Sequence, residues 1–159
     1  MRYLLIACSF AGLVVSNSAL SKDKILCELP VARSGEVIDS IGSGAIPPVL
    51  PIVQMEDGIS YITGGVGDEE LAFLKEQEAC FNTRILLKEK NGDYIGNAEA
   101  VFTDAKGEVV LTVDGAGPYL YANMPKDIYK VKFTRHNGKE KEAKIKVGDK
   151  PKMYYIVLE

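Results

Sequence analysis

The sequence predicts a mainly β protein, built as an antiparallel sandwich, and three observations carry this prediction. From residue 83 onward, runs of β-branched and aromatic residues are separated by turn residues roughly every ten positions. No helical pattern lies between these runs, so the strands are expected to pack sheet against sheet. Only the segment 68–80 has the periodicity of an amphipathic helix. The prediction is a seven-stranded sandwich with one short N-terminal covering helix and a preceding hairpin.

The seven strands are expected within residues 83–159. Asn-Gly pairs at 91–92 and 137–138 supply the positive φ angles that tight hairpin turns require. The final expected strand is apolar on both faces, so we expect the helix to cover its Tyr154, Ile156 and Leu158. The expected strands are 83–90, 94–103, 108–113, 119–122, 128–135, 143–147 and 153–158.

Residues 51–82 are expected to form a hairpin followed by the helix. Two short apolar runs flank Asp57-Gly58, a dipeptide typical of a tight turn. The helix is expected to begin at Asp68 and to end near Cys80. Its apolar residues fall near one face and its glutamates on the other, so one side can lie on a sheet.

Residues 1–21 have the features of a secretory signal peptide. Arg2 is their only charge, and the apolar run that follows is shorter than the ~20 residues of a membrane-spanning helix. We expect cleavage after Ser21, with cleavage after Ser18 as an alternative and a lipoprotein signal at Cys8 as another. No later segment is apolar enough to span a membrane, so the mature protein is expected to be periplasmic or secreted.

The charge balance argues against nucleic acid as a partner. Without residues 1–21 the chain has 18 basic and 22 acidic side chains, whereas a nucleic-acid surface needs concentrated positive charge. Residues 22–50 lack regular patterning and contain Pro47-Pro48, so they are expected to form an extended N-terminal arm.

Two cysteines remain after signal cleavage, Cys27 and Cys80. In an oxidising compartment this pair predicts one disulfide, which would tie the arm to the end of the helix and contribute about 4 kcal/mol in the chain-entropy model. Two buried thiols that never meet are the alternative. No metal or cofactor is expected, because the single histidine, His136, gives the cysteines no obvious third ligand.

The stretch from Gly64 to Glu70 has the glycines of a phosphate-binding loop. Such loops use backbone N–H groups at a helix N-terminus. Here the first helical turn holds Asp68 and two glutamates, which would repel phosphate and which instead complement the helix dipole. Asp68 can also cap the helix. We therefore expect Gly64, Gly65 and Gly67 to form a structural strand-to-helix turn.

Three phrases of the β region are similar to a known family, although Met124 stands where that family has Leu and Asp127 where it has Gly. The phrases lie at 97–101, 104–107 and 124–131. On these residues, the region 83–159 resembles a carboxypeptidase regulatory-like domain, which implies a prealbumin-like sandwich. Upstream, the motif Gly-Gly-Val-Gly-x-Glu-Glu resembles that of small exported proteobacterial proteins of uncharacterised function. The resemblance implies no catalytic residues.

An enzymatic role is not expected. Prealbumin-like sandwiches include a hydrolase of purine-breakdown intermediates that uses paired histidines and an arginine, whereas this chain has only His136. A serine triad would need the same histidine. The hydrolase stays an alternative, and a pocket holding His136 with an arginine and an acid would favour it. A small-ligand carrier, which requires a cavity, is the other alternative.

Two surfaces are candidates for binding. Tyr119 and Tyr121 follow a Gly-Pro turn and would favour recognition if exposed, with cross-strand packing as the alternative. Lysines on neighbouring strands are expected to form a basic face toward an acidic partner or an anionic envelope polymer, with protection of exposed strands as the alternative. These are Lys130, Lys132, Lys141, Lys144 and Lys146. The expected function is a non-catalytic exported module that binds an envelope protein or supports an envelope assembly.

Overall fold

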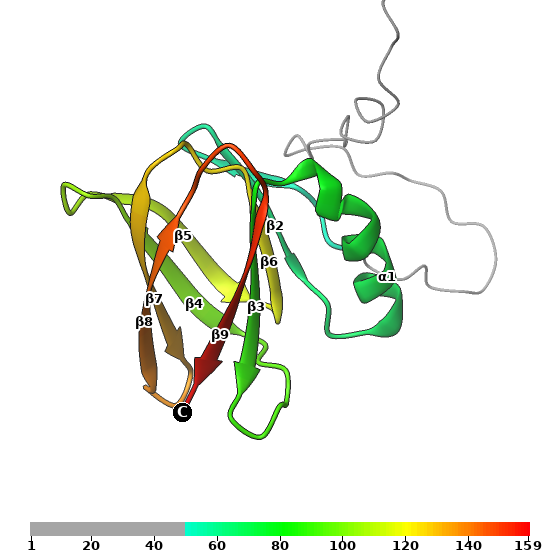
Figure 1. The fold of residues 1–159 in the computed structure, drawn as a ribbon. Coiled ribbons are helices and arrows are strands. Elements are labelled where there is room, and N and C mark those ends of the chain that lie inside the picture. Colours follow the sequence, from blue (N-terminus) through cyan, green and yellow to red (C-terminus); the bar gives the residue numbers. More distant parts are fainter. Residues whose placement is uncertain (1–49) are drawn as a thin grey trace, which may run out of the picture.

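The computed structural model describes residues 50–159. Two β-sheets face each other as a sandwich, and a helix lies beside the larger sheet (Figure 1). The predicted fold class, mainly β with one covering helix and an N-terminal hairpin, is confirmed. The predicted signal peptide, the arm up to residue 49 and Cys27 lie outside the described residues, so they stay predictions.

The two sheets hold five and four strands. The larger sheet has the order β1 (Gln54–Glu56), β2 (Ile59–Gly64), β6 (Tyr119–Ala122), β3 (Thr83–Glu89) and β9 (Lys152–Leu158). The smaller sheet has the order β5 (Val109–Ala116), β4 (Ala98–Thr103), β7 (Ile128–Arg135) and β8 (Glu140–Lys146). The predicted hairpin is β1–β2, and its turn residues Asp57 and Gly58 have φ angles of 48° and 81°. Because β2 pairs with β6, the hairpin widens the larger sheet.

One strand pair departs from the antiparallel prediction. β9 runs parallel to β3, with Thr83 opposite Lys152 and Glu89 opposite Leu158. Side-chain alternation predicts which face of a strand is buried, but it does not predict the direction in which the strand pairs. The predicted strand 94–103 is also shorter than expected. It begins at Ala98, after Asn97 with a φ of 56°.

The main core lies between the sheets. Phe102, Leu111 and Phe133 of the smaller sheet and Ile85 and Leu87 of β3 are almost completely buried there. On β4 and β7 buried residues alternate with more exposed ones, as expected for strands with one wet face. These side chains fill the space between the two sheets in the part of the chain that the structure describes.

Helix α1 (Asp68–Gln77) continues into the 3₁₀ turn η2 (Glu78–Cys80) and covers part of the outer face of the larger sheet (Figure 1). Its Leu74 belongs to a second, smaller core with residues of β2, β3 and β6. Within residues 50–159 no helix is both long and apolar enough to cross a bilayer.

The prediction that this helix covers the apolar strand at 153–158 is wrong. Ile156 and Leu158 are buried in the main core, and Tyr154 packs against the same core. Of this strand, only Met153 joins the cluster under the helix. The other sheet therefore provides the cover that the helix was predicted to give, and the outer face of β9 is left open.

Candidate functional site

The outer face of β9, β3 and β6 carries an exposed group of side chains beside the helix. Register partners on neighbouring strands stand next to each other on one face of a sheet. Here they form two rows, Tyr155–Leu86–Tyr119 and Val157–Lys88–Tyr94. We call the four accessible members, Tyr94, Tyr155, Val157 and Lys88, the tyrosine patch.

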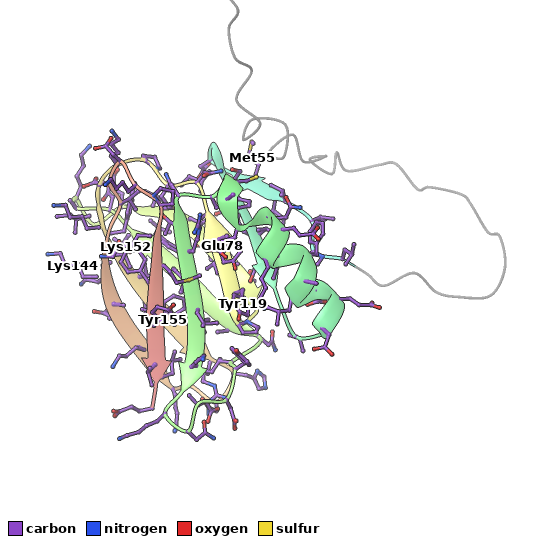
Figure 2. The ribbon with its side chains drawn as sticks, turned by 45° about the vertical axis from the view of Figure 1, so that its right-hand side comes forward. Met55, Glu78, Tyr119, Lys144, Lys152 and Tyr155 are labelled. Atoms are coloured by element: carbon purple, nitrogen blue, oxygen red, sulfur yellow. The ribbon has the colours of Figure 1, made fainter. Side chains whose placement is uncertain are left out.

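The tyrosine patch is open to solvent and has a buried floor. Tyr155 is 70% exposed, Tyr94 is 54% exposed and Val157 is 43% exposed, whereas Leu86 and Tyr119 are buried. Figure 2 shows Tyr155 on β9 and Tyr119 nearer the helix. The ring centroids of Tyr94 and Tyr119 are 6.0 Å apart, so the exposed ring rests beside the buried one. Clustered exposed apolar side chains of this kind mark interaction sites more often than isolated ones do.

The patch contains one cation and borders on an ion pair. The Nζ atom of Lys88 lies 4.9 Å from the centroid of the Tyr94 ring, a favourable cation–π distance. At the border with the helix, Arg84 Nη1 and Glu78 Oε1 are 2.6 Å apart. Burial, followed by hydrogen bonding and charge interactions with Tyr94, raises the pKa of Tyr119 to about 12. The Tyr119 hydroxyl in the floor of the patch therefore stays uncharged to a higher pH than an ordinary tyrosine hydroxyl.

Tyr119 and Tyr121 do not form the exposed surface that the sequence predicts. Tyr121 is fully buried and Tyr119 is 9% exposed, because the helix lies over this part of the sheet. Their rings meet edge-on at 6.2 Å, and Phe81 packs against Tyr121 at the same centroid distance. The packing alternative therefore describes both residues. Among residues 50–159 the exposed tyrosines are Tyr94 and Tyr155, and nothing in the local sequence pattern distinguishes them.

The glycine stretch is a turn that binds its own helix. The Gly65 N–H and the Val66 N–H donate hydrogen bonds to Glu70 Oε2 at 2.9 and 3.1 Å. A phosphate would need these same N–H groups, so the geometry agrees with a structural turn. Gly65 has a φ of 93°, and a Cβ there would stand 2.6 Å from Tyr119 Cδ2. Gly67 has a φ of −118°, and an added Cβ there would meet nothing within 4 Å, so this position does not require glycine.

Asp68 does not cap the helix through its side chain. Gly67 occupies the N-cap position, and no side-chain hydrogen bond is made from it. Asp68 is exposed in the first helical turn, together with Glu69. The position of Asp68 in the first turn is compatible with its predicted interaction with the helix dipole. The Gly65 N–H in the turn before the helix is bound by Glu70 and not by Asp68.

The predicted basic face is a mixed surface of lysines and glutamates. Lys130 and Lys132 of β7 lie 3.7 and 3.3 Å from carboxylate oxygens of Glu142 and Glu140 of β8. The acids fall on this face because β8 alternates with the same period as β7. Lys144 and Lys146 are exposed on the same strand as the acids, whereas Lys141 pairs with Phe133 and lies on the opposite face. β8 is an edge strand, so its charges also suit the edge-protection alternative.

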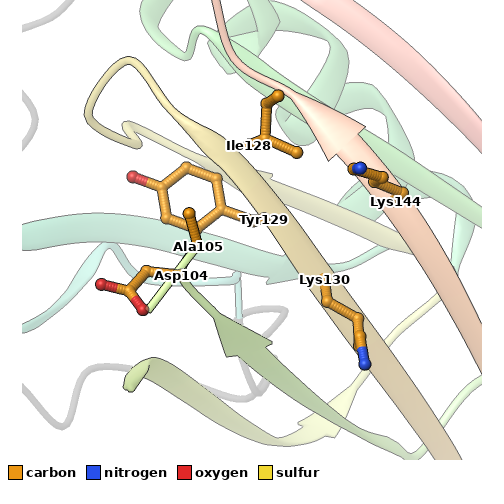
Figure 3. A pocket seen from close by; sticks show the side chains of 6 residues that line it. All are labelled: Asp104, Ala105, Ile128, Tyr129, Lys130 and Lys144. Atoms are coloured by element: carbon orange, nitrogen blue, oxygen red, sulfur yellow. The ribbon is translucent and has the colours of Figure 1, made fainter. Parts of the chain in front are cut away.

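A hollow of about 340 Å³ lies on this face, at the beginning of β7 (Figure 3). Asp104 and Ala105 from the turn after β4 stand on one side of it, and Lys130 and Lys144 from β7 and β8 stand on the other. The remaining lining residues are Ile128 and Tyr129. The hollow therefore combines apolar walls with charges of both signs.

His136 lies at a second hollow, at the opposite end of β7. This hollow of about 260 Å³ is also lined by Glu99, Arg135, Thr134, Asn97 and Gly115. His136 thus shares a hollow with an arginine and an acid, which is the arrangement that would favour a hydrolase. The guanidinium of Arg135, however, is paired with Glu89 at 2.6 Å. Among the described residues, no hydrogen bond joins His136 to Glu99.

Cys80 is disulfide-bonded at the end of η2. The predicted partner, Cys27, lies outside the described residues, so the pairing itself stays a prediction. Within residues 50–159, no group of three or more His, Cys, Asp or Glu side chains is arranged to hold a metal ion.

Comparisons with known proteins give a distant structural likeness. No protein-family model matches the sequence, and no curated protein matches it either. Two crystal structures of BcpA, the major pilin subunit of Bacillus cereus, are similar to the fold, with TM-scores of 0.37 and 0.36 and identities of 16% and 13%. They match 48% and 72% of this chain. The chain spans only 29% and 39% of the pilin chains. At these scores the matches have no bearing on function.

Proposed function

We propose that this protein is a non-catalytic, exported β-sandwich module that binds an envelope protein through the tyrosine patch. The observation that carries the proposal is the open pair of rows on the outer face of β9 and β3, where Tyr94, Tyr155 and Val157 are exposed together. The predicted signal peptide supports the exported location. The resemblance to carboxypeptidase regulatory-like domains agrees with a module that lacks catalytic residues.

Physical chemistry favours a protein partner for this patch. Tyrosine is enriched in protein interfaces, because it combines apolar area with a hydroxyl and loses little side-chain entropy when it is fixed. A sandwich whose interior is filled presents the patch on a rigid surface, which lowers the entropic cost of binding. Lys88 lies among the apolar members and has no ion-pair partner within residues 50–159. The expected partner therefore offers an apolar surface with an acidic group near its centre.

Site-specific photo-crosslinking in the native envelope tests this proposal. A photoreactive residue at Tyr155 is expected to give a discrete protein adduct. The same residue at Val109 of β5, which is 59% exposed on the other sheet, is the control and is expected to give none. The adduct from position 155 should be lost when Lys88→Glu is added, while the circular dichroism spectrum of that variant stays that of the folded protein. Equal adducts from both positions, or an adduct that survives Lys88→Glu, would contradict the proposal.

Hydrolysis is a second candidate function, and the hollow around His136, Arg135 and Glu99 is the observation that favours it. A general base has to reach a proton-bearing group, and exposed His136 has no such partner in the described structure. The test is turnover of chromogenic esters, amides and phosphate esters by the purified protein and by His136→Ala. Turnover that disappears in the variant would support hydrolysis, and absence of turnover in the native protein would exclude it for these substrates.

A further inference from the structure

The hollow at the beginning of β7 has an unusual charge arrangement. Lys130 and Lys144 are direct register partners on neighbouring strands, and like charges placed opposite each other destabilise a sheet. Lys130 is offset by Glu142 at 3.7 Å. Lys144 has no ion-pair partner among the described residues. One ammonium group at the mouth of the hollow is therefore uncompensated.

The opposite wall of the hollow is a fixed carboxylate. Asp104 Oδ1 accepts hydrogen bonds from the Lys106 N–H at 2.8 Å and from the Glu108 N–H at 2.9 Å. These bonds hold the Asp104 side chain in the turn after β4. Its negative charge disfavours a ligand that carries acids at both ends, so the hollow selects against extended polyanions.

Between these charges the walls are apolar. Ile128 is 39% exposed on the same outer face as the lysines, and Ala105 stands across from it (Figure 3). The Tyr129 hydroxyl donates to the Pro125 carbonyl at 3.0 Å, so the ring is fixed and its polar end is already satisfied. A volume of about 340 Å³ is at the small end of the range for ligand pockets.

We propose that this hollow binds a single carboxylate carried on an apolar body. The carboxylate lies against the uncompensated ammonium group of Lys144, with Lys130, which Glu142 only partly offsets, as the second cation beside it. The apolar part lies against Ile128 and Ala105. An acyl chain and the C-terminal end of a peptide with an apolar last residue share this chemistry. The site is on the smaller sheet and the tyrosine patch is on the larger one. A failure of this proposal would therefore leave the proposed function of the tyrosine patch unaffected.

The test is a titration of the full mature protein followed by backbone amide NMR. The probes are octanoate with its neutral amide, and an acetylated peptide ending in leucine with its C-terminal amide. Each acid is expected to shift the resonances of residues 104–105, 128–130 and 144 at millimolar concentration, and each amide is expected not to. A response to octanoate alone identifies an acyl ligand, and a response to the peptide alone identifies a chain end.

Matched variants make the test specific. Lys144→Gln and Lys130→Gln are expected to weaken binding of the acid about three- to tenfold, whereas Lys139→Gln, in the exposed β7–β8 turn, should leave it unchanged. Asp104→Asn keeps the acceptor oxygen for the turn and removes the charge, so it should tighten binding. Equal binding of acids and amides, an equal effect of Lys139→Gln, or no shift with either acid would overturn the proposal.

Discussion

Glu70 closes the turn that precedes its own helix by accepting the Gly65 N–H at 2.9 Å. The same carboxylate oxygen also accepts the Val66 N–H, so one side chain satisfies two backbone donors ahead of the N-cap. The arrangement is related to a capping box, in which a glutamate at the third helical position reaches back to the N-cap. A glycine stretch that resembles a phosphate-binding loop thus uses its backbone N–H groups to bind the carboxylate of Glu70.

Replacement of Glu70 by alanine should destabilise the protein by about 1–2 kcal/mol, because two hydrogen bonds to a charged acceptor are lost. Glu70→Gln keeps an acceptor oxygen and should lose less. Urea unfolding followed by circular dichroism measures both effects. Glu69→Ala in the same helical turn is the control and should cost less than about 1 kcal/mol. Equal losses in Glu70→Ala and Glu69→Ala would show that the turn does not depend on this carboxylate.

Replacement of Gly65 by alanine should also be costly. The backbone there has a φ of 93°, and the new Cβ would stand 2.6 Å from Tyr119 Cδ2. The expected loss is about 1–3 kcal/mol from backbone strain alone, with the steric contact adding to it. Gly148→Ala is the matched control, since nothing lies within 4 Å of its added Cβ. Unfolding midpoints that agree between the two variants would contradict the described turn.

The buried tyrosines predict a loss of stability in alkali. Burial, with the charge of Glu78 as the next cause, raises the pKa of Tyr121 to about 12. A tyrosine with a raised pKa in the folded state contributes stability that is fully present below its unfolded pKa of about 10 and is lost as the pH rises toward 12. Unfolding free energy should therefore fall over this interval, and Tyr121→Phe should flatten the fall. Phenolate absorbance of the folded protein gives an independent measurement.

Tyr121→Phe also tests the buried hydroxyl at neutral pH. The Tyr121 hydroxyl oxygen is buried and has no hydrogen-bond partner among the described residues. Removal of an unsatisfied polar atom leaves no partner unpaired, so the variant should be as stable as the native protein or more stable. A loss above about 1 kcal/mol would indicate a hydrogen bond that the described residues do not contain.

The predicted pairing of Cys27 with Cys80 can be checked directly by peptide mapping. Digestion of the mature protein without reduction should release one cross-linked peptide pair that contains both cysteines. Reduction should then lower the stability by about 4 kcal/mol. Cys27→Ser is expected to leave Cys80 open to thiol labelling, and Ser34→Ala is a neutral control in the same segment. A cross-link between Cys80 and Cys8 would contradict both the pairing and cleavage after Ser21.

Local sequence signals predict much of this fold because each acts within a few residues. Asp57 and Gly58 have the positive φ angles that their hairpin turn requires. On β7, the alternating sequence correctly predicts one buried and one more exposed face. The helix from Asp68 to Cys80 begins and ends as expected. In each case the physical cause, a turn preference or a buried stripe, lies in the segment itself.

The features that sequence patterns miss depend on contacts between distant segments. Tyr121 and Tyr155 look alike in the sequence, yet one lies under the helix and the other is open. That difference follows from where the helix lies on the sheet and from the parallel entry of β9 beside β3. For the same reason, the glutamates that interrupt the basic face become neighbours of Lys130 and Lys132 only once β7 and β8 are aligned.

The pairing of β3 with β9 also has a consequence for when the protein can fold. β3 lies between β6 and β9, so residues 83–89 keep one unpaired edge until residues 152–158 have been made. Contacts so far apart in the chain form slowly, because a long loop has to close first. The larger sheet therefore cannot be completed until residues 152–158 have been synthesised, and the nascent chain stays incompletely folded until then.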